Sequence, residues 1–231
     1  MQRASQLLSD NGGCRLPCWL GITPGVTTWA AAYADLRPFS QIISQGPYEV
    51  TTDGKRQVKS FHNVTFLLPN ESQEGGFHAT EVDGIVAMML VGPKTASKAG
   101  LSLSSLLIDY GMPDQVFIDT TSHFPGEKPF DLLLYYAQQN IFADFEAWGR
   151  IEGDFICAVP QQCFPWIWLW ADHSNYETDD PYPVWTGVGG EVRVPVPLEE
   201  LTDLTLETFY AIYQDEHFAD PLCVPIDRLP E

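Results

Sequence analysis

Apolar and polar residues follow one another along this chain in patterns that predict short helices, each followed by strands. Residues 29–36 have the composition of a helix, which Thr27 or Thr28 would cap and Pro38 would end. A second helix would begin after Ser102 or Ser104 and end at a glycine at position 111. A third helix is predicted near the end of the chain, over residues 205–214.

The strands are predicted from alternation and from turn residues. The run 58–68 alternates with period two, which is typical of a strand with one buried face. An Asp-Gly pair at 83–84 lies between two apolar runs and predicts a tight hairpin. The more apolar face of the run 58–68 carries His62, Val64, Phe66 and Leu68.

The second helix is followed by strands in the same order as the first. A short strand is predicted over 116–119, and the runs 130–136 and 141–148 predict a hairpin. Both parts of the chain therefore place a helix before antiparallel strands. The order of elements matches, whereas the residues themselves do not.

These elements predict an α+β fold, in which short helices cover one face of an antiparallel sheet. One interpretation is an internal duplication over residues 20–92 and 100–150, and the alternative is a single sheet. The expected organisation is a first α+β unit over 14–92 and a second helix-plus-strands unit over 100–150. An aromatic-rich extension with a C-terminal helix and tail would occupy 151–231, and all three parts could form one domain.

The charge of the chain narrows the choice of partners. Hydrophobic residues make up 45% of the 231 residues, which is typical of a globular protein. The 12 Lys and Arg against 31 Asp and Glu give a net charge of −19, which repels nucleic acid and anionic membranes. The most apolar stretches, 84–92 and 164–171, are too short for a transmembrane helix.

The five cysteines indicate an oxidising compartment. Cys14 and Cys18 are close in a turn-rich segment and are predicted to form a disulfide. For the second bond we prefer Cys157–Cys163, which leaves Cys223 unpaired, and the alternative is that Cys223 clamps the C-terminal tail. The expected location is the cell envelope or outside the cell, with a removed leader or anchor, and the alternative is the cytoplasm.

Motifs for common catalytic and cofactor-dependent mechanisms are not found in the sequence, so no cofactor and no metal are expected. The five histidines are scattered singly. An acidic loop over 172–183 does not fit a calcium-binding EF-hand, because its sixth and twelfth positions are Glu177 and Pro183. Looser coordination of calcium by Glu177, Asp179 and Asp180 is the alternative.

A pair of carboxylates is the enzymatic alternative that the composition leaves open. A glycosidase needs two acids on opposite sides of a bond, one of them with a raised pKa. With 31 acidic residues, no spacing rule selects the pair. Glu146, beside Trp148 at the end of a predicted strand, is the candidate, and an outward-facing acid is the simpler interpretation.

Aromatic residues give a stronger indication of a binding site. Trp166, Trp168 and Trp170 alternate with Ile167 and Leu169, so a strand would place the three indoles on one face. Both faces are then apolar, which is typical of a strand buried in the core. The functional interpretation is an aromatic platform that binds a sugar, a peptide or a partner protein.

The segment 14–29 (CRLPCWLGITPGVTTW) resembles an opening that recurs in uncharacterised bacterial envelope proteins. The segments 106–116 and 132–145 also look like that group. This resemblance implies a location in the cell envelope and no assigned activity.

A more remote resemblance concerns the plan of the chain. The order Gly-Ile-Thr-Pro-Gly, helix, and Tyr-Gly-x-Pro turn into strands is similar to SmpA/OmlA-type lipoprotein domains. The tandem β-lactamase-inhibitor protein has a comparable plan. Such domains pack a helical layer on an antiparallel sheet and bind proteins without catalysis. Their Gly-Met-Thr start is absent here and residues 151–231 have no counterpart, so their partners are not carried over.

The sequence therefore favours a non-enzymatic, extracytoplasmic binding or structural module with a protein or glycan partner. The alternatives are a carboxylate-based hydrolase and an intracellular acidic adaptor. A pocket that contains two acids, at least one of them with a pKa raised by burial, would favour the hydrolase, and five reduced thiols would favour the adaptor.

Overall fold

The computed structural model describes residues 8–9, 11–52, 55–66, 75–120, 129–171 and 195–229. The predicted α+β fold is confirmed, since these residues form short helices and antiparallel strands. Two compact units divide the chain: the first contains Met1–Gly100, Gln138–Ile141 and Ile167–Glu177, and the second contains the remainder. No helix within the described ranges is both long enough and apolar enough to cross a membrane.

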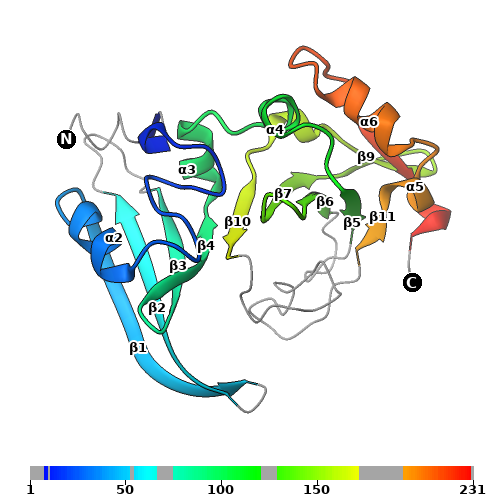
Figure 1. Ribbon diagram of the computed structural model, residues 1–231. Coiled ribbons are helices and arrows are strands. Elements are labelled where there is room, and N and C mark those ends of the chain that lie inside the picture. Colours follow the sequence, from blue (N-terminus) through cyan, green and yellow to red (C-terminus); the bar gives the residue numbers. More distant parts are fainter. Residues whose placement is uncertain are drawn as a thin grey trace. The chain divides into compact units, whose positions relative to one another are not determined.

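The first unit is built on five strands in the order β1-β2-β3-β4-β10, each antiparallel to its neighbours. Only the part of β2 from Lys59 to Thr65 pairs with β3. The β1–β2 ribbon therefore continues past β3 as a two-stranded arm (Figure 1). The bounds are Ser40–Thr52 for β1, Lys55–Phe66 for β2, Gly76–Val82 for β3, Ile85–Val91 for β4 and Trp166–Trp170 for β10.

Helix α2 (Trp29–Leu36) covers one face of this sheet. Of the two predicted caps the structure selects Thr28, whose side chain accepts a hydrogen bond from the backbone N–H of Ala31. Trp29 stacks on His62 of β2 with ring centroids 3.6 Å apart. His62 shares its strand face with two fully buried residues, Val64 and Phe66, so the predicted apolar face is confirmed over the described part of the strand, whereas Leu68 lies outside the described residues.

The hairpin predicted at the Asp-Gly pair is confirmed between β3 and β4. Asp83 and Gly84 both have positive φ, at 51° and 87°, as a two-residue hairpin turn of this kind requires. Asp83 also fixes the turn to β2, because its carboxylate accepts a hydrogen bond from Val58 N and its own N–H donates to Val58 O.

The predicted disulfide between Cys14 and Cys18 is confirmed, with Cα atoms 5.7 Å apart. The side chain of Asn11 donates hydrogen bonds to the carbonyls of both cysteines and accepts one from Leu20 N. Trp19 in the same loop is fully buried. The loop therefore fixes Trp19 in the core ahead of α2. Elsewhere in this unit, the short helix α3 (Pro93–Lys98) follows β4.

The second unit contains the strand order β7-β6-β5-β11. Helix α4 (Leu103–Tyr110) begins at a capping box formed by Ser102 and Ser105 and ends at Gly111, where φ is 80°. The predicted hairpin is confirmed by β6 and β7. The remaining bounds are Gln115–Asp119 for β5, Pro129–Tyr136 for β6, Ile141–Trp148 for β7, Val196–Pro197 for β11, Leu198–Leu201 for α5 and Leu206–Tyr213 for α6.

A small sheet in the second unit corrects the predicted pairing of the cysteines. β8 (Arg150–Glu152), β9 (Phe155–Ala158) and β12 (Leu222–Pro225) pair in the order β12-β9-β8. Cys157 and Cys223 lie directly opposite each other on β9 and β12 and form a disulfide, with Cα atoms 4.0 Å apart. The preferred bond Cys157–Cys163 is therefore wrong, and Cys163 has a free thiol. The pairing of β9 with β12, and not proximity along the chain, decides which cysteine bonds to Cys157.

The two units repeat the order of helix and then antiparallel strands. Four consecutive strands follow α2, whereas three follow α4 before the small sheet begins. An internal duplication remains a prediction.

Candidate binding face

Pairing within the first unit places two rows of side chains on the sheet face opposite α2. Residues that face each other across a ladder point to the same side of a sheet. We call this side, away from His62 and α2, the open face. One row contains Ile43, Asn63, His78, Leu90 and Trp168, and the next contains Gln45, Phe61, Thr80, Met88 and Trp170.

The outer part of the open face, on β1 and β2, exposes large apolar side chains to solvent. Ile43 is 54% exposed, Phe61 is 45% exposed and Tyr48 is 49% exposed. Tyr48 and Phe61 are in ring contact, with centroids 6.2 Å apart. Asn63 and His78 are exposed beside them, so amide and imidazole groups interrupt the apolar surface.

The three tryptophans of the predicted platform lie at the inner part of this sheet. Trp168 is only 9% exposed, and Trp166 and Trp170 are half-buried. Ile167 and Leu169 point to the other face and are fully buried. The more exposed aromatic side chains on the described part of this face are therefore Tyr48 and Phe61 of the β1–β2 ribbon, which the sequence did not single out.

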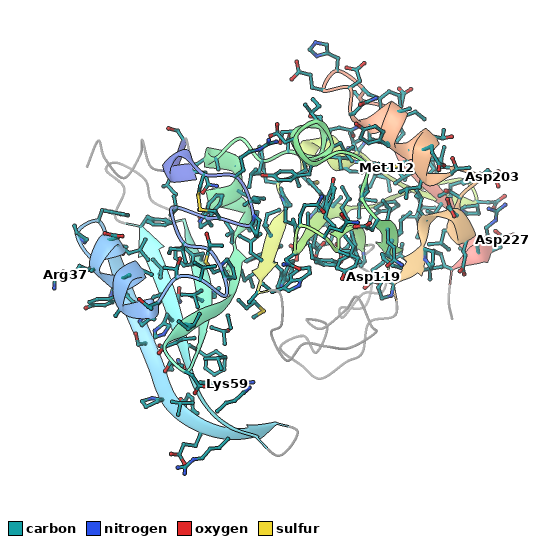
Figure 2. All side chains as sticks on the ribbon, viewed as in Figure 1. Arg37, Lys59, Met112, Asp119, Asp203 and Asp227 are labelled. Atoms are coloured by element: carbon teal, nitrogen blue, oxygen red, sulfur yellow. A yellow bond between two sulfur atoms is a disulfide. The ribbon has the colours of Figure 1, made fainter. Side chains whose placement is uncertain are left out.

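The open face differs from the rest of this acidic chain in the charged side chains that its described part presents. The acidic residues in the sequences of the five strands are Glu49 and Glu81. Glu49 pairs with Val58 in the ladder, and Glu81 hydrogen-bonds to His62, so both lie on the side of α2. Lys59 is on the open face, where the ribbon leaves the sheet (Figure 2). The described part of the open face has no carboxylate, in a chain with 31 acidic residues.

A polar network lies on the opposite side of the same sheet. His62 is 4% exposed; its Nδ1 is 2.9 Å from Ser44 Oγ and its Nε2 is 2.9 Å from a carboxylate oxygen of Glu81. Burial lowers the pKa of His62, while the hydrogen bond and charge of Glu81 act in the opposite direction. Both ring nitrogens are satisfied and Trp29 covers a ring face, so this arrangement fixes α2 to the sheet.

The second unit contains the acid that the sequence suggested for a hydrolytic pair, together with three buried aspartates. The candidate Glu146 is exposed at the end of β7. Three aspartates are buried instead: Asp119, which is labelled in Figure 2, Asp131 and Asp144. Asp119 and Asp131 lie opposite each other on β5 and β6. In the sequence, these three buried residues are marked by an aspartate within an otherwise apolar strand.

A pocket of about 220 Å³ in the second unit also contains two acids, Asp114 and Glu199. A carboxylate oxygen of Asp114 accepts a hydrogen bond from Ala137 N at 2.7 Å, and one of Glu199 accepts from Leu206 N at 3.0 Å. Both carboxylates therefore accept hydrogen bonds from backbone N–H groups around the pocket.

Neither the free thiol nor the histidines form a metal centre in the described part of the chain. No group of three or more His, Cys, Asp or Glu is arranged there to hold an ion. Burial and the charges of Asp131 and Glu146 raise the pKa of Cys163, which makes its thiol a weaker nucleophile at neutral pH. Glu177, Asp179 and Asp180, the alternative calcium ligands of the loop 172–183, lie outside the described residues.

Comparison of the chain with protein families, with characterised proteins and with solved structures finds no significant match. The resemblance to envelope proteins stays a prediction.

Proposed function

We propose that this protein is a non-enzymatic, extracytoplasmic binding module whose partner, a protein or a glycan, docks on the open face. The observation that carries the proposal is the exposure of Ile43, Tyr48 and Phe61 together on one side of a paired sheet. Exposed apolar surface costs free energy in water, and contiguous patches of it mark interaction sites. The neighbouring Asn63 and His78 supply hydrogen-bonding groups for specificity.

Two features support an extracytoplasmic location. Four of the five cysteines are paired in disulfides, which persist mainly in oxidising compartments. The strand pairing of Cys157 with Cys223 ties the C-terminal segment to the second unit, so this bond has a structural role.

A carboxylate-based hydrolase is less well supported. Such an enzyme needs two acids that can act on a bound substrate in a cleft. In the pocket of the second unit, Asp114 and Glu199 accept backbone hydrogen bonds. Glu146 is exposed on β7 and is not among the residues that line that pocket.

Site-specific photo-crosslinking in the native host tests the proposal. A benzophenone amino acid in place of Phe61 should give a discrete adduct after irradiation. The same residue in place of Ile108, which is 61% exposed on α4, is the matched control and should not give that adduct. No adduct at position 61, or the same adducts at both positions, would contradict a binding role for the open face.

A further inference from the structure

The pocket of the second unit lies where strand pairing along the edge of β5 stops. β11 pairs with Phe117 and Ile118 of β5, and the chain then turns into α5, which contacts β5 (Figure 1). The pocket of about 220 Å³ occupies the edge of β5 next to this pairing. Five of the eight described residues that line it are apolar, and the others are Asp114, Gln115 and Glu199. The pocket therefore combines an apolar wall with two carboxylates.

Backbone hydrogen bonds hold each of these carboxylates through one oxygen. Asp114 Oδ2 accepts from Ala137 N at 2.7 Å, and Glu199 Oε1 accepts at 3.0 Å from the N–H of Leu206, the first residue of α6. The other oxygens, Asp114 Oδ1 and Glu199 Oε2, are not used in these two bonds and can accept from a ligand. Because both acids are already oriented, a ligand that binds them does not have to order them first.

The charge of the second unit selects a cationic ligand for this pocket. Its sequence has four Lys and Arg residues and 21 Asp and Glu residues, and such a field opposes the approach of an anion. The basic residues that the structure describes in this unit are Arg150 and Arg228, and neither lines the pocket. Two carboxylates that share a small pocket repel each other, and a cation between them stabilises both.

Size and hydrogen-bonding geometry narrow the ligand further. Sites for drug-sized molecules have volumes of about 300–1,000 Å³, so this pocket fits a smaller molecule or one side chain. A guanidinium pairs best with both oxygens of one carboxylate, but the backbone already uses one oxygen of each acid. A primary ammonium has three N–H donors that rotate about one bond, so it can donate to one oxygen of each acid.

We propose that this pocket binds an alkylammonium group, that is, a primary ammonium on a short aliphatic stem. The ammonium donates hydrogen bonds to Asp114 Oδ1 and Glu199 Oε2, and the stem packs on the apolar wall. The group is either a lysine side chain of a partner protein or a free small amine. The pocket belongs to the second unit, so this inference does not depend on the open face of the first unit.

NMR titration of the oxidised, full chain with n-butylammonium chloride tests the inference. The backbone amide signals of Ala137 and Leu206 are the reporters, because these N–H groups donate to the two carboxylates. Both signals should shift and saturate, with a dissociation constant in the millimolar range for so small a ligand. n-Butanol has the stem without the charge, and NaCl has a cation without the stem, so neither should give a saturable shift. n-Butylguanidinium should bind more weakly than n-butylammonium.

Matched variants test whether the two acids bind the cation. Asp114→Asn and Glu199→Gln each keep a carbonyl oxygen for the backbone N–H but remove the charge, so each should weaken butylammonium binding about tenfold or more. Glu200→Gln removes the same charge from the next residue of α5, which does not line the pocket. At physiological salt, which screens exposed charges, Glu200→Gln should bind like wild type. Circular dichroism of each variant verifies that it is folded.

A second titration separates the two sources of the ammonium group. Nα-acetyl-lysine methylamide carries this group on a blocked backbone, and Nα-acetyl-alanine methylamide is its control. Binding of the blocked lysine assigns the pocket to a lysine of a partner protein, whereas binding of butylammonium alone assigns it to a free amine.

Three results would overturn the inference. One is that neither amine gives a saturable shift, another is that butanol or butylguanidinium binds as tightly as butylammonium, and the third is that both acid variants bind like wild type. Crosslinking at position 61 tests the open face separately, so the proposed function can stand or fail whatever this pocket binds.

Discussion

His62 is enclosed by groups from three elements of the first unit. Trp29 of α2 stacks on its ring, Ser44 of β1 meets Nδ1, and Glu81 of β3 meets Nε2. Burial is the larger influence on its pKa and lowers it from 6.5, although Glu81 favours the protonated form. The folded protein therefore favours the neutral imidazole more than the unfolded chain does.

This shift predicts how stability depends on pH. Because the pKa of His62 is lower in the folded state, its contribution is fully present above about pH 6.5 and is lost as the pH falls below that value. The free energy of unfolding, measured with denaturant at pH 8 and at pH 5.5, should fall less between these two pH values for His62→Gln than for wild type. The exposed His78→Gln is the control and should keep the wild-type pH dependence. Equal pH dependence in all three proteins would refute the assignment.

Alternation predicted that His62 lies on the buried face of its strand, but its partners were not predictable. Ser44 and Glu81 belong to different strands, and only the register of the sheet brings them to the two ring nitrogens. A single histidine in a strand pattern does not indicate which polar groups will satisfy it.

At the scale of elements, the β3–β4 turn is fully explained by local chemistry. Asp83 and Gly84 supply the two positive φ values, and Asp83 bonds to Val58 of β2. Among the described residues other than its chain neighbours, no atom lies within 4 Å of the position that a Cβ on Gly84 would occupy, so a substitution there acts mainly on the backbone energy.

Gly84→Ala should therefore destabilise the protein by about 1 kcal/mol, because an L-residue with a side chain disfavours positive φ. Gly84→Asn should cost clearly less, since asparagine tolerates this conformation. Thermal and urea unfolding of both variants measure the difference. Equal losses for alanine and asparagine would show that the side chain, and not φ, is responsible.

Strand β10, which contains the three tryptophans, shows which properties of a strand cannot be predicted from its own sequence. The sequence predicts correctly that the indoles alternate with aliphatic residues in a strand, and β10 has this form. How far Trp168 is exposed depends on what packs over it. Phe61 is exposed because the described residues leave its side of the β1–β2 ribbon uncovered, and a strand sequence does not encode that.

On the scale of the whole molecule, the disulfides divide into a local and a long-range constraint. Cys14 and Cys18 are four residues apart, whereas Cys157 and Cys223 are 66 residues apart. In the chain-entropy model a longer loop removes more freedom from the unfolded chain.

Replacing Cys157 and Cys223 together by alanine should cost about 4 kcal/mol of stability, and the same change at Cys14 and Cys18 about 2 kcal/mol. Chemical denaturation of both double variants measures the order of the two losses. Thiol titration of the denatured, unreduced protein should find one free thiol, from Cys163, and titration after reduction should find all five. Five free thiols before reduction would contradict both bonds and favour the intracellular adaptor.

The sequence by itself determined the elements of this protein. Local signals act over a few residues: a threonine cap before α2, a serine before α4, the Asp-Gly turn and the alternation of β2. The choice of Thr28 over Thr27 and of Ser102 over Ser104 came from the structure. The turn-bound disulfide of Cys14 and Cys18 was predictable for the same reason, because its partners are joined by a short stretch of chain.

Only the tertiary structure decided which distant residues meet and which surfaces remain uncovered. The pairing of β9 with β12 selected Cys223 over the nearer Cys163, and sheet register joined Ser44 and Glu81 to His62. The open face exists because α2 packs on one side of the sheet while β1 and β2 expose the other. Contacts of this kind depend on the free energy of the whole packed unit, and no single segment of the sequence contains it.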